Sequence, residues 1–179
     1  MKWIFCLLAS GALLWGAGEL SGRRAPGFSL PDLRLQQHDL ADYRGKVVVL
    51  DIIQTSCAHC AVSAETLQKV HQKYGSKVAV LMFANPPDTQ ATVSTFAADH
   101  KITVPILFDC GQAAVSYLKA TPDNPSISVP HLFLIDGQGI IRNDFTYGDD
   151  TRLIFEGEGL YAEIDQLLGA PAPAKKPVR

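Results

Sequence analysis

A continuous run of apolar residues, Val47–Ile53, is interrupted by one charged residue, Asp51. The run is rich in β-branched residues and has no polar alternation, which predicts a strand buried on both faces. After a short turn, the segment Ala61–Tyr74 contains no glycine or proline and repeats apolar residues at near-helical spacing. Gly75 follows at the place where a helix stop is expected. The pattern therefore predicts a strand, a turn and a helix in succession.

Similar patterns continue along the chain and predict further strands and helices in alternation. Strands are predicted over 77–83, 104–108, 131–135 and 140–145, the last two joined by a hairpin turn at 136–139. Helices are predicted over 89–100, 112–119 and 153–168, the last interrupted by Gly157 and Gly159. A small hairpin over 25–33 and a helical turn over 39–43 precede the first buried strand. This order favours a mixed sheet with helices on both faces.

The turn after the first buried strand leads into the motif Cys57-Ala58-His59-Cys60. Unpaired N–H groups and the dipole at a helix N-terminus favour negative charge, so they stabilise a thiolate on Cys57. Cys60 follows three residues later, close enough to attack a mixed disulfide formed by the first thiol. The motif beside a βαβ pattern therefore predicts redox chemistry, with Cys57 as nucleophile.

Two other interpretations of the cysteine pair are a structural disulfide and half of a zinc site. A zinc site usually needs a second Cys/His pair at short spacing, which the sequence lacks. Cys110 is predicted to be a small buried core residue, with a third redox thiol as the alternative. The remaining lone histidines, which are predicted to lie on the surface, are His38, His71 and His100.

The chain has 179 residues, enough for one domain with a sizeable core. The charge is nearly balanced, with 16 basic and 18 acidic residues, and no basic stripe is present. Nucleic acid is therefore not expected as a partner. The four cysteines are too few for a disulfide-stabilised scaffold.

The N-terminus has the layout of a secretory signal peptide. Lys2 precedes an apolar run over 3–14, and the small residues Gly16-Ala17-Gly18 follow. The run is short for a membrane span, which needs about 20 apolar residues. These features predict a signal peptide over 1–18, a segment that includes Cys6. The rest of the chain is predicted to form a linker over 19–24, one domain over 25–168 and a disordered tail over 169–179. We expect export to the periplasm or cell envelope, with an uncleaved membrane anchor as the alternative.

Four segments resemble those of the TlpA/ResA group of thiol–disulfide oxidoreductases, redoxins related to the AhpC/TSA proteins. They are the opening A-P-G-F-S-L over 25–30, the approach to the first buried strand over 40–50, the C-x-x-C over 57–60, and the Val-Pro strand with its hairpin over 129–139. The resemblance covers residues 25–168. It implies an α/β fold, a thioredoxin-like three-layer α/β/α sandwich with a mixed central sheet and an N-terminal β-hairpin extension.

The resemblance also implies roles for individual residues in disulfide exchange with protein substrates. Cys57 would be the attacking thiol and Cys60 the resolving one. Pro130 would be cis beside the disulfide, with Val129 offering its backbone to an extended substrate peptide. No cofactor or metal is implied, a membrane or soluble redox partner would regenerate the enzyme, and a monomer is expected.

Asp51 lies six residues before Cys57 and matches the buried acid of thioredoxin, which accepts a proton as the second thiol ionises. The alternative is a carboxylate that is salt-bridged or exposed at a sheet edge. A carboxylate inside an apolar strand is costly unless it titrates or is paired. We therefore favour the functional interpretation.

Three positions depart from the usual pattern of the group. Ser56 stands where tryptophan usually precedes the first cysteine, and Ile52-Ile53 replaces an aromatic pair. Ser63 stands three residues after Cys60, where a glutamate is often found. The departures leave the subfamily and the substrate surface open.

Two other functions are alternatives to disulfide exchange. A peroxiredoxin-like thiol peroxidase would carry proline and threonine seven and three residues before its reactive cysteine, but these positions are Leu50 and Gln54. A copper-binding metallochaperone could use the cysteine pair with His59 or His131, because thiolates and imidazole suit copper. For His131 we favour a half-buried strand residue near the site over a ligand.

His59 is predicted to bind substrate. It also affects whether the cysteine pair oxidises or reduces its substrates. A partly charged imidazole there would favour the Cys57 thiolate and so make the disulfide more oxidising. Thioredoxin lies near about −270 mV and the C-P-H-C oxidase DsbA near about −120 mV. Ala58 replaces the proline of that oxidase, while Asp51 resembles the acid of thioredoxin. A potential between these limits is expected, with Cys60 holding its proton more tightly than Cys57.

Overall fold

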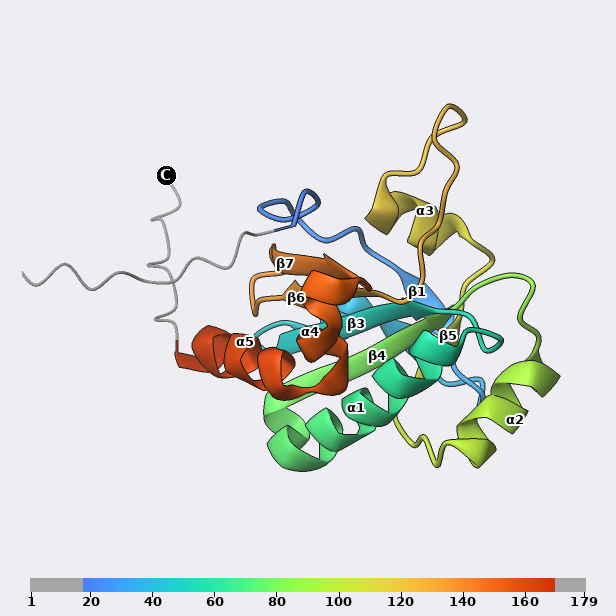
Figure 1. Ribbon diagram of the computed structural model, residues 1–179, viewed down its shortest axis with the longest axis horizontal. Helices are drawn as coiled ribbons and strands as arrows, with labels where there is room; N and C mark the ends of the chain where they lie inside the picture. The colour runs from blue at the N-terminus through green and yellow to red at the C-terminus, as the bar shows by residue number, and fades with distance from the viewer. Residues whose placement is uncertain (1–17, 170–179) are drawn as a thin grey trace, which may run out of the picture.

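The computed structural model describes residues 18–169, which form a five-stranded mixed sheet flanked by helices (Figure 1). The strands follow the order β5-β4-β3-β6-β7 across the sheet. β3 is central and parallel to β4, and β4 is parallel to β5, whereas β6 runs antiparallel to both β3 and β7. The strands are β3 (Val47–Ile53), β4 (Val78–Ala84), β5 (Ile106–Phe108), β6 (His131–Ile135) and β7 (Ile141–Thr146).

Every residue of β3 is buried, as its unbroken apolar pattern predicts. Val49 and Ile53 contribute to a core shared with four helices, whereas Val48 and Leu50 belong to a second core on the opposite face. The first core packs against α1 (Ala58–Tyr74), α2 (Gln90–Asp99), α4 (Arg152–Glu156) and α5 (Glu158–Gly169); the second packs against α3 (Gln112–Leu118) and the N-terminal segment. The predicted three-layer α/β/α arrangement is thus confirmed.

The C-terminal helical region consists of two helices, because Gly157 separates α4 from α5. Gly157 has φ 113°, a backbone conformation that side chains rarely adopt. Single 3₁₀ turns occur at η1 (Leu40–Tyr43), η2 (Gly75–Lys77) and η3 (Asp149–Thr151). The first of these confirms the predicted helical turn.

The N-terminal hairpin lies later in the chain than predicted. β1 (Ser29–Pro31) pairs with β2 (Gln37–Asp39) in a separate two-stranded sheet. The prediction of His38 as a surface residue is wrong, because its side chain is buried in this hairpin. Its Nε2 lies 3.3 Å from a carboxylate oxygen of Asp32, and its Nδ1 lies 2.6 Å from the Tyr43 hydroxyl. These polar partners make the burial possible.

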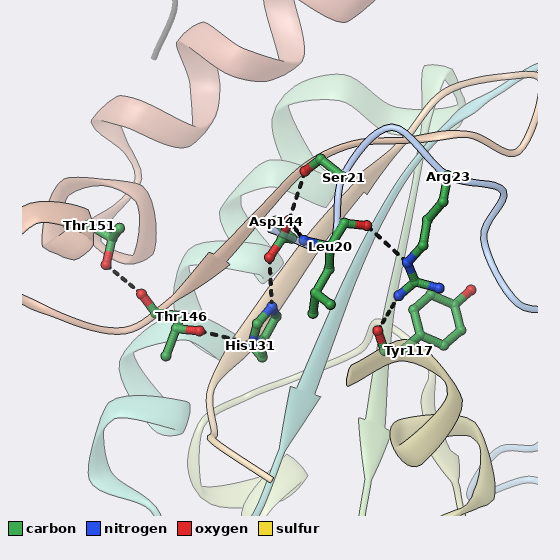
Figure 2. Close-up of polar contacts among 8 residues, drawn as sticks. All are labelled: Leu20, Ser21, Arg23, Tyr117, His131, Asp144, Thr146 and Thr151. Atoms are coloured by element: carbon green, nitrogen blue, oxygen red, sulfur yellow. Dashed lines mark hydrogen bonds and ion pairs between the residues drawn. The ribbon is translucent and has the colours of Figure 1, made fainter. Parts of the chain in front are cut away.

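The segment before the hairpin is hydrogen-bonded to β7, and Figure 2 shows its contacts with Asp144. Gly22 donates its N–H to Ile141, and the Leu20 N–H donates to Asp144 at 3.0 Å. The predicted signal peptide and tail fall outside the described residues, apart from Gly18 and Gly169. Among the helices within residues 18–169, none has the length and apolar character that a membrane crossing requires.

The topology gathers several loops at one edge of the sheet. Parallel strands β3, β4 and β5 end at this edge, and antiparallel β6 begins there. The register pairs Ile52 near the end of β3 with His131 at the start of β6. The Cys57 loop and the Val129-Pro130 segment are therefore brought together, although they are far apart in the sequence.

Candidate active site

Cys57 lies at the junction between the loop after β3 and the start of α1. It is the N-cap of the helix, with φ −91° and ψ 116°, and its Sγ accepts a hydrogen bond from the Cys60 N–H at 3.3 Å. A capping group satisfies one of the amides that a helix N-terminus leaves unpaired. In general, a thiolate accepts such a bond better than a thiol and is stabilised at a helix N-terminus.

Cys60 occupies the opposite environment, in the first turn of α1. Its side chain is 0% exposed, whereas Cys57 is half-buried, and both thiols are free in the structure. Burial raises the pKa of the Cys60 thiol, and the hydrogen bond with Cys57 and the charge of Asp51 raise it further. The two sulfurs therefore differ in solvent access, and Cys60 holds its proton tightly.

The Val129–Pro130 peptide bond is cis and faces the cysteine pair. The Val129 carbonyl oxygen lies 3.8 Å from Cys57 Sγ, within reach of a weak S–H···O hydrogen bond. Val129 is half-buried and Pro130 is buried. The backbone just before β6 therefore lies beside the Cys57 sulfur, which is the more accessible of the two.

Asp51 lies on the face of β3 that packs against α1 and is 0% exposed. Its Oδ2 accepts a hydrogen bond from the Ser63 hydroxyl at 2.6 Å, whereas Oδ1 has no hydrogen-bond partner among the described residues. Burial raises the pKa of Asp51 to about 7; the Ser63 bond and the amides of His131 and Ile52 act in the opposite direction. The carboxyl is thus able to exchange a proton near neutral pH.

A second loop supports the turn that precedes Cys57. Asp88, in the loop between β4 and α2, accepts hydrogen bonds from the Thr55 N–H at 2.8 Å and from the Thr55 hydroxyl. The Gln54 side chain donates to the Pro86 carbonyl at 3.0 Å. Sequence reasoning missed Asp88, because its place in a polar turn does not reveal which loop it contacts.

His59 is exposed, and its ring stacks on Tyr147, with ring centroids 4.0 Å apart and an interplanar angle of 20°. Tyr147 also packs against Phe155 of α4, and its N–H donates to the Pro130 carbonyl at 3.4 Å. Tyr147 was not among the predicted site residues, since it follows β7 and carries no motif. It joins the C-x-x-C helix to the proline segment.

His131 is buried, not half-buried as predicted, and is engaged by two polar side chains (Figure 2). Its Nε2 lies 3.2 Å from Asp144 Oδ2, and its Nδ1 lies 3.0 Å from the Thr146 hydroxyl. Burial acts to raise the pKa of Asp144, but bonds from His131, Ser21 and Leu20 outweigh it and hold the pKa below its ordinary value. Within residues 18–169 no three His, Cys, Asp or Glu side chains gather in a way that could hold a metal ion.

The prediction of Cys110 as a buried core residue is wrong, because its side chain is exposed. It follows β5 and precedes Gly111, whose φ of 99° turns the chain into α3. The neighbouring Asp109 is the buried member of this turn and accepts hydrogen bonds from the N–H groups of Ala113 and Ala114. Apolar character alone predicted burial, but the turn directs the thiol outward.

Comparisons with known proteins agree with this site. The model of the AhpC/TSA family matches residues 21–144. The thioredoxin-like protein YneN of Bacillus subtilis is 29% identical over 128 residues, which are 70% of this chain and 71% of the relative. The thiol-disulfide oxidoreductase ResA of Geobacillus kaustophilus is 29% identical over 125 residues, covering 70% of this chain and 68% of the relative.

Solved structures show the same fold. The thioredoxin domain of a thiol-disulfide oxidoreductase from Bacteroides vulgatus superposes with a TM-score of 0.67, covering 83% of this chain and 98% of that domain at 19% identity. The family match spans most of the described chain, and the cysteine pair stands at the strand–helix junction. The chain therefore belongs to the AhpC/TSA family and, within it, is a thiol–disulfide oxidoreductase of the TlpA/ResA type.

Proposed function

We propose that Cys57 attacks the disulfide of a protein substrate and that Cys60 resolves the resulting mixed disulfide. The observation that carries this assignment is the hydrogen bond from the Cys60 N–H to a half-buried Cys57 sulfur, beside a fully buried Cys60. The Cys57 thiolate forms a bond to one substrate sulfur, and the other substrate sulfur leaves. The Cys60 thiolate then bonds to Cys57, releasing the substrate dithiol. Single-turnover exchange in variants of the two cysteines tests this order.

Asp51 is proposed as the group that accepts the proton of Cys60 in the second step. The Cys60 thiol is buried and its pKa is raised, so it needs a base within the protein. Asp51 is buried on the same side of the sheet, and its charge acts on Cys60. In the reverse reaction the protonated carboxyl would return the proton to Cys60, and substrate thiols would be oxidised.

Val129 and Pro130 are proposed to bind an extended substrate segment beside Cys57. The Val129 carbonyl lies 3.8 Å from the reactive sulfur, and main-chain groups at such a position can pair with an extended peptide. His59 is exposed and stacks on Tyr147, whose N–H donates to the Pro130 carbonyl, so His59 would also contact the substrate. The substrates are thus protein thiols and disulfides, and a membrane or soluble redox partner would regenerate a monomeric enzyme.

The substitution His59→Ala should make the reduction potential of the Cys57–Cys60 disulfide more negative. A protonated imidazole beside the helix N-terminus would stabilise a thiolate on Cys57 and hence the reduced form. Stacking against the face of Tyr147 adds a favourable site for this charge. The measurement is equilibration of the pair with a glutathione redox buffer.

The control is His71→Ala, which removes an exposed histidine from the last turn of the same helix. This change should leave the potential unaltered, because His71 lies at the opposite end of α1. A His59→Ala potential equal to that of the wild type, or less negative, would show that His59 does not favour the reduced form. The proposed oxidising tendency would then have to be abandoned.

Export with cleavage after Gly18 is also proposed, supported by Lys2, the apolar run over 3–14 and the small residues that follow. When the complete chain is produced in a bacterium, the protein should be found in the cell envelope or periplasm. N-terminal sequencing of that fraction should begin near Glu19. Recovery of the full-length chain from the cytosol would contradict the proposal, whereas a full-length chain in the membrane would indicate an uncleaved anchor instead.

A further inference from the structure

Ser63 lies on the buried face of α1, three residues after Cys60, and its side chain points across to β3. Ser63 is 1% exposed and Asp51 0%. A serine inside a helix commonly faces solvent or bonds to a carbonyl of its own helix. Here the Ser63 hydroxyl instead donates to Asp51 Oδ2 at 2.6 Å. The contact ties the strand acid to the helix turn that carries Cys60.

This bond makes the two oxygens of the carboxyl inequivalent. Oδ2 is engaged by Ser63, whereas Oδ1 is buried and has no hydrogen-bond partner among residues 18–169. The flanking strands place Met82 and Leu132 beside Asp51 in the register, and neither side chain titrates. Cys60, in the first turn of α1, is a titrating group on which the charge of this acid acts. A proton taken up by the carboxyl is directed to Oδ1.

We propose that Ser63 is a positioning residue of disulfide exchange, which holds Asp51 Oδ2 so that Oδ1 receives the proton of Cys60. The inference rests on the proposed roles of Cys60 and Asp51. In the step concerned, the S–H bond of Cys60 breaks and its proton moves to Oδ1. The Cys60 sulfur then bonds to Cys57, the bond between Cys57 and the substrate sulfur breaks, and the substrate leaves with that electron pair.

Ser63 has a second effect, because a hydroxyl donor favours the charged carboxylate over the neutral acid. Its bond therefore opposes the burial that raises the pKa of Asp51 to about 7. Without the hydroxyl, more of the carboxyl would be protonated at neutral pH and unable to act as a base. The serine thus adjusts the proton affinity of an acid that lies on the neighbouring strand.

The test is a single-turnover reaction of the reduced full chain with an aromatic disulfide whose released thiolate is coloured. Cys6→Ser and Cys110→Ser are introduced first, so that only the Cys57–Cys60 pair can react. The first phase reports attack by Cys57 and the second reports resolution by Cys60. In Ser63→Ala the pH midpoint of the second phase should rise by about one unit. At pH values below the midpoints of both proteins, the second phase of Ser63→Ala should therefore be about tenfold slower than that of the wild type. The pH profile of the first phase should be the same in the two proteins.

Two further variants separate positioning from packing. Ser63→Thr keeps the hydroxyl and should keep the wild-type midpoint. Thr66→Val removes a different buried hydroxyl from the next turn of α1, and should also leave the midpoint unchanged. The inference is overturned if Ser63→Ala has the wild-type midpoint, or if Thr66→Val or the first phase shifts equally. Absence of a second phase with Ser63 intact would instead contradict the proposed role of Cys60.

Discussion

Replacing Cys57 by serine should reduce disulfide exchange to the rate seen without protein, because a serine hydroxyl is far less nucleophilic than a thiolate. Replacing Cys60 by serine should give a different result. Cys57 would still attack, but no buried thiol would be present to release the substrate. The mixed disulfide between Cys57 and the substrate should therefore accumulate in stoichiometric amount. Mass spectrometry of the acid-quenched reaction would measure it.

Cys110→Ser is the matched control, since Cys110 is also a free thiol but is exposed at the end of β5. Its removal should leave turnover unchanged, and the oxidised protein should contain a Cys57–Cys60 disulfide. Turnover by Cys57→Ser would show that another thiol attacks. A Cys57–Cys110 linkage, or efficient reduction of hydrogen peroxide by the purified protein, would instead support the thiol peroxidase alternative.

The substitution Asp51→Asn should stabilise the protein at alkaline pH and leave its stability nearly unchanged below about pH 4. The folded-state pKa of Asp51 is raised to about 7 from an ordinary value of 3.8. A raised value means that the contribution of this group to stability is fully present below about pH 4 and is lost as the pH rises through 7. At about 1.4 kcal/mol per pKa unit, the loss is on the order of 4 kcal/mol at high pH.

Denaturant unfolding of the wild type and of Asp51→Asn at pH values below 4 and above 8 would measure this difference in the free energy of unfolding. Asparagine is chosen because it has the same shape as aspartate but no charge. Asp144→Asn is the control of opposite sign. The pKa of Asp144 is lowered, so its contribution is present above its ordinary pKa and is lost as the pH falls through the folded value. That variant should be less stable than the wild type at high pH. An Asp51→Asn effect of equal size at both pH values would show that ionisation of Asp51 is not its cause.

Local patterns were sufficient to predict the core of the site. The apolar run of β3 indicated a strand buried on both faces, and the glycine-free segment after it indicated a helix. The position of Cys57 at their junction follows from these two elements alone. Asp51 could also be singled out, because a charged residue inside a fully buried strand needs a chemical reason.

Contacts between elements were not predictable from these patterns. His38 and Cys110 were assigned to the wrong environments, because an isolated residue carries no sign of its partners. His38 is buried where Asp32 and Tyr43 meet its ring, and Cys110 is exposed by the turn at Gly111. The periodicity of an element reports which of its faces is buried, but not which side chain lies opposite.

The sequence by itself determined the order of strands and helices, the cysteine pair at a helix N-terminus and the acid in the central strand, since each depends on neighbours along the chain. Only the tertiary structure decided that Ser63 donates to Asp51, that Tyr147 stacks on His59, and that Val129 faces Cys57. These three contacts depend on strand register and helix packing, which bring residues from distant segments within a few ångströms. The geometry around the two sulfurs is therefore a property of the assembled sheet.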